Sequence, residues 1–114
     1  MGFLNKLFSK KLDLQSKHAS SIYTFYINDI FTIKRVGCIV FGIVKGSDIR
    51  VGDDVYIIDV NGNRLPSKVM SMENPRVGEM NIAPVGSNVG ILLSDIEAKQ
   101  LHRGDILTNE KKIN

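Results

Sequence analysis

Residues 25–55 have the sequence FYINDIFTIKRVGCIVFGIVKGSDIRVGDDV, in which short apolar runs alternate with turn residues. Many of the apolar residues are β-branched or aromatic, and each run is too brief for a helical period. The run at 38–44 is almost unbroken, which is typical of a strand buried in a core. We therefore predict a first strand over about 23–33 and a second strand over that run, with a turn that ends at Gly37 between them.

The same signals predict four further strands along the chain. Asn61 and Gly62 stand between two strand-like runs, and an Asn-Gly pair in this position is the strongest short-range signal for a hairpin. The four predicted strands are 55–60, 64–73, 86–93 and 105–108. Residues 94–101 instead predict a helical turn with Asp95 as its N-cap residue. Residues 74–84 show no clear pattern, because a proline and a glycine interrupt them.

Six or seven short strands without alternating long helices favour an all-β protein, and we expect a small closed barrel. Closure removes the exposed edges that a strand as apolar as 38–44 would otherwise present to other chains. The strand pattern by itself does not separate a barrel from a β-sandwich. A chain of 114 residues is long enough for one compact core. We expect the barrel to span 23–108, after a connector at 19–22 and before a tail at 109–114.

The positive charge of the chain is concentrated at one end. Residues 1–18 hold four lysines and one aspartate, which equals the whole net charge of +3. The basic and acidic residues of 19–114 therefore cancel. Sequence-independent binding to nucleic acid depends mainly on neutralising phosphates, and an electroneutral domain supplies little of that. The charge distribution thus argues against a general RNA-binding surface on the barrel, although it permits a small local patch.

The same N-terminal segment (residues 1–18) places apolar side chains at helical spacing, with lysines off the apolar stripe. This apolar face consists of Phe3, Leu4, Leu7 and Phe8. We expect a short, cationic amphipathic helix. Two roles for it are open: it docks on the barrel or frays as a terminal tail, or it binds an anionic membrane surface or a protein partner.

No constellation for catalysis is visible. The phosphate-binding pattern Gly-x4-Gly-Lys-Ser/Thr is absent, so we expect no nucleotide site. The two histidines, His18 and His102, are far apart in sequence and give no metal-ligand spacing with the lone Cys38. Asp53, which follows Gly52, has the composition of a tight turn rather than of a catalytic acid. We expect a non-enzyme without metal or cofactor.

The location of the protein is predicted from the same composition. Cys38 has no partner for an internal disulfide, and its apolar neighbours indicate a small buried hydrophobe in a reducing compartment. No apolar stretch approaches the length of about 20 residues that a membrane span requires. The first residues lack the apolar core and cleavage site of a signal peptide. We therefore expect a cytoplasmic protein.

Several separated motifs, in one order along the chain, carry a family resemblance. They comprise Phe25, Ile27, Asp29, Ile30, Phe31, Ile33, Gly37, Gly42, Val44, Ile49, Gly52, Asp53 and Val55, then Val69, Met72 and Glu73, then Gly86, Asn88, Val89, Gly90, Ile91, Leu92 and Leu93, and finally Arg103, Gly104, Asp105, Ile106 and Leu107. Together they resemble domain 2 of the translational GTPases, the group that includes elongation factor Tu. The resemblance covers roughly residues 23–108 and implies a Greek-key barrel.

The resemblance also implies a binding site. In elongation factor Tu this domain helps to hold the aminoacyl end of tRNA, and in related factors it contacts ribosomal RNA. Asp29, Phe31 and Asn88 match family residues that line the aminoacyl pocket, and Glu73 matches an acidic residue that meets the terminal adenosine. Each also has a structural interpretation. Asp29 and Asn88 would hold turns, Phe31 would belong to the core, and Glu73 would be solvated.

Three residues depart from the family pattern. Asn28 replaces an acidic residue, and Phe41 replaces a threonine whose pocket its bulk would fill. Arg35 replaces the first glycine of a turn, which would reshape that turn and displace a basic side chain that is a further candidate for binding. The resemblance thus implies a free-standing binding module that contacts the ribosome, tRNA or a translation factor. The alternative is an adaptor that binds a protein or a membrane surface through the N-terminal segment.

Overall fold

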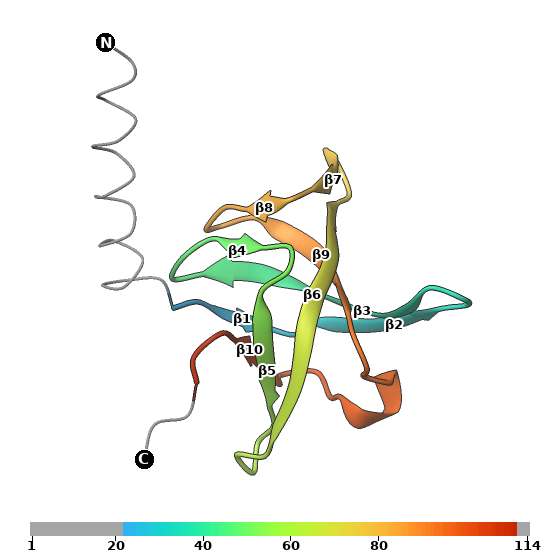
Figure 1. Ribbon diagram of the computed structural model, residues 1–114, viewed down its shortest axis with the longest axis vertical. Helices are drawn as coiled ribbons and strands as arrows, with labels where there is room; N and C mark the ends of the chain where they lie inside the picture. Colours follow the sequence, from blue (N-terminus) through green and yellow to red (C-terminus); the bar gives the residue numbers. More distant parts are fainter. Residues whose placement is uncertain (1–21, 112–114) are drawn as a thin grey trace.

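The computed structural model describes residues 22–111, and these form an all-β structure (Figure 1). The elements are β1 (Thr24–Tyr26), β2 (Asp29–Ile33), β3 (Gly37–Lys45), β4 (Ile49–Arg50), β5 (Asp54–Ile58), β6 (Arg64–Asn74), β7 (Gly78–Met80), β8 (Ile82–Ala83), β9 (Asn88–Leu93), the 3₁₀-helix η1 (Ala98–Gln100) and β10 (Ile106–Thr108). The predicted N-terminal helix lies outside the described residues. No helix within 22–111 is long and apolar enough to cross a membrane.

Six antiparallel strands close into a barrel. Their order is β1-β10-β5-β6-β9-β3, and pairing of β1 with β3 completes the circle. β2 extends the sheet beyond β3, β7 pairs with the end of β6, and β4 pairs with β8 as a separate two-stranded ribbon. In Figure 1 the β2–β3 hairpin runs out to the right of the barrel. The predicted closed all-β barrel is therefore confirmed.

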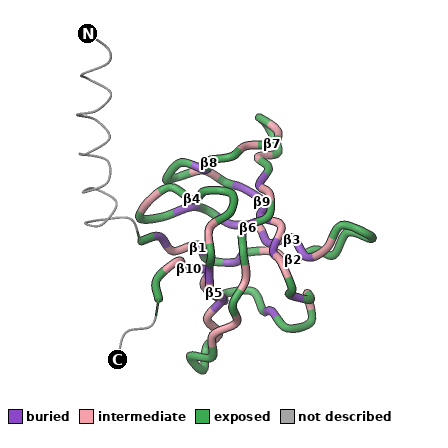
Figure 2. The backbone as a smooth tube through the Cα atoms, viewed as in Figure 1, coloured by how far each residue is buried: buried purple, intermediate pink, exposed green. Residues whose placement is uncertain are grey.

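The core lies inside the barrel and follows the alternation of the strands. Along β3 the side chains of Cys38, Val40 and Val44 are buried, whereas Ile39 and Phe41 on the opposite face are only partly covered. This is the period-2 pattern of a strand with one face in a core. Figure 2 shows buried residues along the strands and exposed residues at the tips of the hairpins. The expectation that Cys38 is a small buried hydrophobe is confirmed.

The strand predicted over 23–33 is two strands, because the chain changes partners in its middle. β1 pairs with β10 and with the end of β3, whereas β2 pairs with the beginning of β3. At the break, the Ile27 backbone N–H donates to the Asp105 carbonyl oxygen at 2.9 Å, and the Asn28 N–H donates to the Phe41 carbonyl oxygen at 2.8 Å. The apolar pattern continues through this exchange of partners, so it does not reveal the break.

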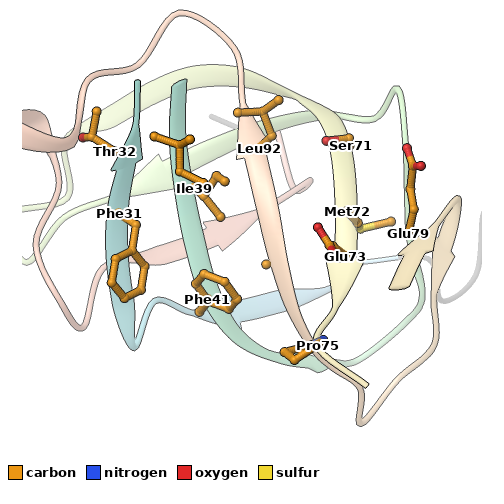
Figure 3. A pocket seen from close by; sticks show the side chains of 12 residues that line it. Phe31, Thr32, Ile39, Phe41, Ser71, Met72, Glu73, Pro75, Glu79 and Leu92 are labelled. Carbon is orange, nitrogen blue, oxygen red and sulfur yellow. The ribbon is translucent and has the colours of Figure 1, made fainter. Parts of the chain in front are cut away.

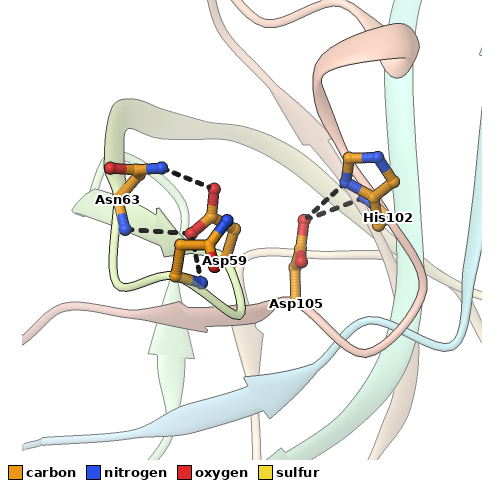
Figure 4. A network of polar contacts seen from close by, with 5 residues as sticks. Asp59, Asn63, His102 and Asp105 are labelled. Carbon is orange, nitrogen blue, oxygen red and sulfur yellow. Dashed lines mark hydrogen bonds and ion pairs between the residues drawn. The ribbon is translucent and has the colours of Figure 1, made fainter.

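The hairpin predicted at Asn61 and Gly62 is confirmed, although its loop is longer than the two-residue kind. The strands pair at Ile58 and Arg64, so β5 ends two residues earlier than predicted. The Asp59 carboxylate organises the loop by accepting hydrogen bonds from the backbone N–H groups of Asn61 and Asn63, each at 2.9 Å (Figure 4). The hydrogen bonds from Asn63 are the main reason that the pKa of Asp59 is lowered.

The helical turn predicted over 94–101 is wrong in its start. The only helical residues there are those of η1, whose N-cap residue is Glu97 rather than Asp95. The Glu97 backbone N–H donates to Oε1 of Gln100 at 2.8 Å. Asp95 has φ 54°, a left-handed conformation that an N-cap does not adopt. The side chain of Ile96 is buried, so the chain must turn sharply to place it in the core. The need to bury Ile96 thus overrides the local helical pattern.

The turn between β2 and β3 holds a residue in an unfavourable conformation. Arg35 has φ 67°, in the left-handed region that costs a side-chain-bearing residue about 1 kcal/mol or more relative to glycine. Arg35→Gly should therefore raise the free energy of unfolding by about 0.5–1 kcal/mol, as measured by urea denaturation. Lys34→Gly, at a neighbouring turn residue without positive φ, should lower it. Equal effects of the two substitutions would contradict this account.

Candidate binding site

The outer face of the sheet β2-β3-β9-β6 carries two rows of side chains that the strand register places next to one another. The rows are Phe31, Ile39, Leu92 and Ser71, and Asp29, Phe41, Gly90 and Glu73. Because neighbouring strands lie about 4.8 Å apart, residues within a row are in reach of each other. Residues more than forty positions apart in the chain thus form one continuous surface.

This surface is hollowed into an open groove of about 730 Å³ (Figure 3). Phe31 and Phe41 form one wall, with ring centroids 5.5 Å apart and planes at 87°, the edge-to-face geometry that aromatic pairs prefer. Gly90 supplies the floor beneath Phe41. A Cβ atom built at Gly90 would lie 2.7 Å from Cε1 of Phe41, so the ring covers the space that a side chain there would need.

One end of the groove is acidic. Glu73 on β6 and Glu79 on β7 both line it and are direct cross-strand neighbours. Both residues are exposed, and neither has an ion pair with another residue of the described part of the chain. No lysine or arginine is among the groove-lining residues. Like charges placed directly opposite each other on paired strands repel, so this end of the groove favours a positively charged group.

A smaller hollow of about 300 Å³ continues from the groove and shares Phe31 and Phe41 with it. Asp29 and Asn88 also line this hollow. The Asp29 carboxylate pairs with the guanidinium of Arg103, with 3.0 Å between Oδ1 and Nη2. This ion pair orients Asp29 and compensates its charge, so Glu73 and Glu79 remain the uncompensated acids of the surface.

The structure brings together four of the five barrel residues predicted for binding. Asp29, Phe31 and Asn88 line the smaller hollow, and Phe31 and Glu73 line the groove. Arg35 lines neither, because it lies in the turn between β2 and β3. The predicted partner face in the N-terminal segment (Phe3, Leu4, Leu7 and Phe8) lies outside the described residues.

The alternative interpretations of these residues have different outcomes. Phe31 is 49% exposed, so its assignment to the core is wrong. Asp29 bonds to the Arg103 side chain rather than to a turn backbone. Glu73 is solvent-exposed, as the structural interpretation predicted. For Asn88 the backbone carbonyl oxygen accepts a hydrogen bond from the Asn74 side chain at 2.9 Å.

Sequence reasoning missed the role of Phe41 and of Glu79. Phe41 was expected to fill a pocket, but it stands beside Phe31 and forms the wall of one. The alternation of β3 contained this signal, since Phe41 and Ile39 share the face opposite the buried Cys38 and Val40. Glu79 follows a segment without a readable pattern, and only its pairing with Glu73 brings it to the groove.

Within residues 22–111, His102 is the one histidine and Cys38 the one cysteine. The His102 backbone N–H donates to the Asp105 carboxylate at 2.8 Å, and the exposed imidazole is 3.9 Å away from the same oxygen (Figure 4). Burial raises the pKa of the Cys38 thiol, which disfavours the reactive thiolate. Within residues 22–111, no group of three or more His, Cys, Asp and Glu side chains is placed to hold a metal ion. The chain matches no protein-family model.

Proposed function

We propose that this protein is a free-standing, non-catalytic binding module, similar to domain 2 of elongation factor Tu, that contacts RNA or protein of the translation machinery. The observation that carries the proposal is the convergence of Asp29, Phe31, Glu73 and Asn88, from three different strands, on the groove and the smaller hollow that shares its aromatic wall. These are the residues that the family resemblance assigns to binding. We include in the proposal a Greek-key connection of the strands, an N-terminal amphipathic helix and a cytoplasmic location.

The residues that line the groove indicate which chemical groups of the translation machinery it can bind. Aromatic and aliphatic walls suit a flat base or an apolar side chain, since both stack well on exposed rings. Phosphates are disfavoured, because Glu73 and Glu79 are uncompensated and no cation lines the groove. The groove therefore suits an unpaired base or a protein side chain better than a phosphate backbone.

The proposal predicts binding that depends on the groove. Full-length protein should co-sediment with bacterial ribosomes or bind tRNA saturably at moderate salt. Phe31→Ala should weaken that binding about tenfold, because it removes one of the two rings of the aromatic wall. Tyr26→Ala is a matched control: Tyr26 is an aromatic residue on a strand, 48% exposed against 49% for Phe31, and it does not line the groove. Its binding should equal that of the wild type.

Two results would overturn the proposal. One is the absence of binding to ribosomes, tRNA or any translation factor by the folded wild-type protein. The other is an equal loss with Phe31→Ala and Tyr26→Ala, since a groove-independent contact does not distinguish them. Glu73→Ala separates the two ends of the site. A smaller loss with Glu73→Ala than with Phe31→Ala would locate the contact at the aromatic wall.

A further inference from the structure

We propose that the N-terminal segment (residues 1–18) docks in the groove of its own molecule, with its apolar face on the aromatic wall and its lysines near the acidic end. This inference goes beyond the proposed function and does not depend on it. It concerns an occupant of the groove that the chain itself supplies. Residues 1–18 lie outside the described part of the chain; their sequence and the structure of the groove carry the proposal.

The first reason is charge complementarity. The groove ends at two facing carboxylates, Glu73 and Glu79, which have no ion pair within residues 22–111. Two like charges at directly opposed strand positions destabilise the sheet unless a cation lies nearby. The N-terminal segment carries the entire net charge of the chain, +3. Its four lysines against one aspartate therefore make it complementary in charge to an acidic groove.

The second reason is the match of apolar surface. Phe31 and Ile33 on β2 are 49% and 47% exposed, on the side of the groove where Ile39 and Leu92 are also partly uncovered. An apolar patch of this kind on a barrel is usually a contact surface. Phe3, Leu4, Leu7 and Phe8 are the large apolar residues of the segment that helical spacing gathers on one face. Burial of both faces removes apolar area from water on each side.

The third reason is reach. A Cβ atom built at Gly46 would lie 2.7 Å from the Ile22 carbonyl oxygen, so the segment joins the barrel beside the end of β3. Phe41 lies five residues before Gly46 on β3, or roughly 16 Å away. Residues 18–21 span up to about 13 Å when extended, and a helix adds about 1.5 Å per residue. The segment is therefore long enough to cover the groove of the same molecule.

A tryptophan reporter tests the proposal in the full-length protein. The chain contains no tryptophan, so Phe8→Trp introduces a single fluorophore on the apolar face of the segment. Docking should shift its emission to the blue and protect it severalfold from quenching by acrylamide. Both effects should be lost when Phe31→Ala or Glu73→Lys is added. Glu73→Lys suits this purpose because lysine opposite Glu79 forms an attractive cross-strand pair, so the barrel itself is preserved.

The controls separate docking from its alternatives. Tyr26→Ala, outside the groove, should leave the emission of Trp at position 8 unchanged. Emission that stays constant on dilution supports docking within one molecule, whereas loss of the blue shift on dilution would overturn it in favour of a second copy. Emission that is red in solution, and blue only with vesicles of phosphatidylglycerol and phosphatidylcholine, would also overturn it. No ribosome or tRNA is present in these measurements, so their outcome is separate from that of the proposed function.

Discussion

Gly42→Ala should destabilise the barrel by about 3 kcal/mol or more, because the space for a Cβ atom is occupied by backbone. A Cβ atom built at Gly42 would lie 2.2 Å from the Tyr26 carbonyl oxygen and 3.0 Å from the ring of Phe25. Both residues belong to β1, and the pairing of β1 with β3 closes the barrel. Single domains have only about 5–15 kcal/mol of stability, so this loss is a large share.

Gly90→Ala is the control substitution with which the stability loss of Gly42→Ala is compared. Both glycines lie in central strands of the barrel and neither has positive φ, so the backbone entropy term is similar. At Gly90, however, the Cβ atom meets the ring of Phe41 at 2.7 Å, and that partly exposed side chain can rotate away. We expect a cost of about 1 kcal/mol and a disturbed groove wall. Urea denaturation followed by circular dichroism measures both variants, and equal midpoints would contradict the explanation.

The two glycines also show how far the sequence predicts the fold. The apolar run at 38–44 predicts a buried strand without any structural knowledge, and β3 confirms it. The sequence does not show that Gly42 faces a carbonyl oxygen of another strand while Gly90 faces a ring. That distinction depends on which strands cross, and crossing is a property of the whole barrel. The break between β1 and β2 escapes prediction for the same reason.

The family resemblance points to some residues of the candidate site but not to the surface that they share. Asp29, Phe31, Glu73 and Asn88 were selected through the family resemblance, and spacing alone does not bring them together. Their proximity depends on the registers of β2 with β3, β3 with β9 and β9 with β6, and a shift by one residue would reverse every face. β6 contains an irregularity between Val69 and Ser71 that adjusts this register, and no sequence pattern marks it.

Tyr23→Phe should lower the free energy of unfolding at neutral pH by about 1–2 kcal/mol, because it removes a hydrogen bond to a carboxylate. The Tyr23 hydroxyl donates to Oδ2 of Asp53 at 2.7 Å, and the Tyr23 side chain is buried. Asp53 lies in the turn between β4 and β5, where the same oxygen accepts the Arg50 backbone N–H at 3.1 Å. This hydrogen bond therefore connects the residue before β1 to a turn in another part of the barrel. Phenylalanine keeps the ring but cannot donate this hydrogen bond.

The hydrogen bond between Tyr23 and Asp53 also makes the free energy of unfolding depend on pH. Burial, followed by the hydrogen bond to Asp53 and the negative charge of Asp53, raises the pKa of Tyr23 in the folded protein. The unfolded chain releases its tyrosine protons near the ordinary value of about 10, while folded Tyr23 retains its proton. The contribution of Tyr23 to the free energy of unfolding is therefore fully present below about pH 10. It is lost as the pH rises above that value, by about 1.4 kcal/mol at pH 11.

Urea denaturation at pH 7, 9 and 11 tests this linkage. The difference in the free energy of unfolding between wild type and Tyr23→Phe should be constant from pH 7 to pH 9 and should shrink at pH 11. At pH 11 only the wild type releases the Tyr23 proton when it unfolds, and this release favours the unfolded state. Tyr26→Phe, at a half-exposed ring, is the control and should follow the wild type across the series. Parallel loss of stability in wild type and Tyr23→Phe would show that the Tyr23 hydroxyl is accessible to water, and the tie to Asp53 would then be too weak to hold β1 against the turn.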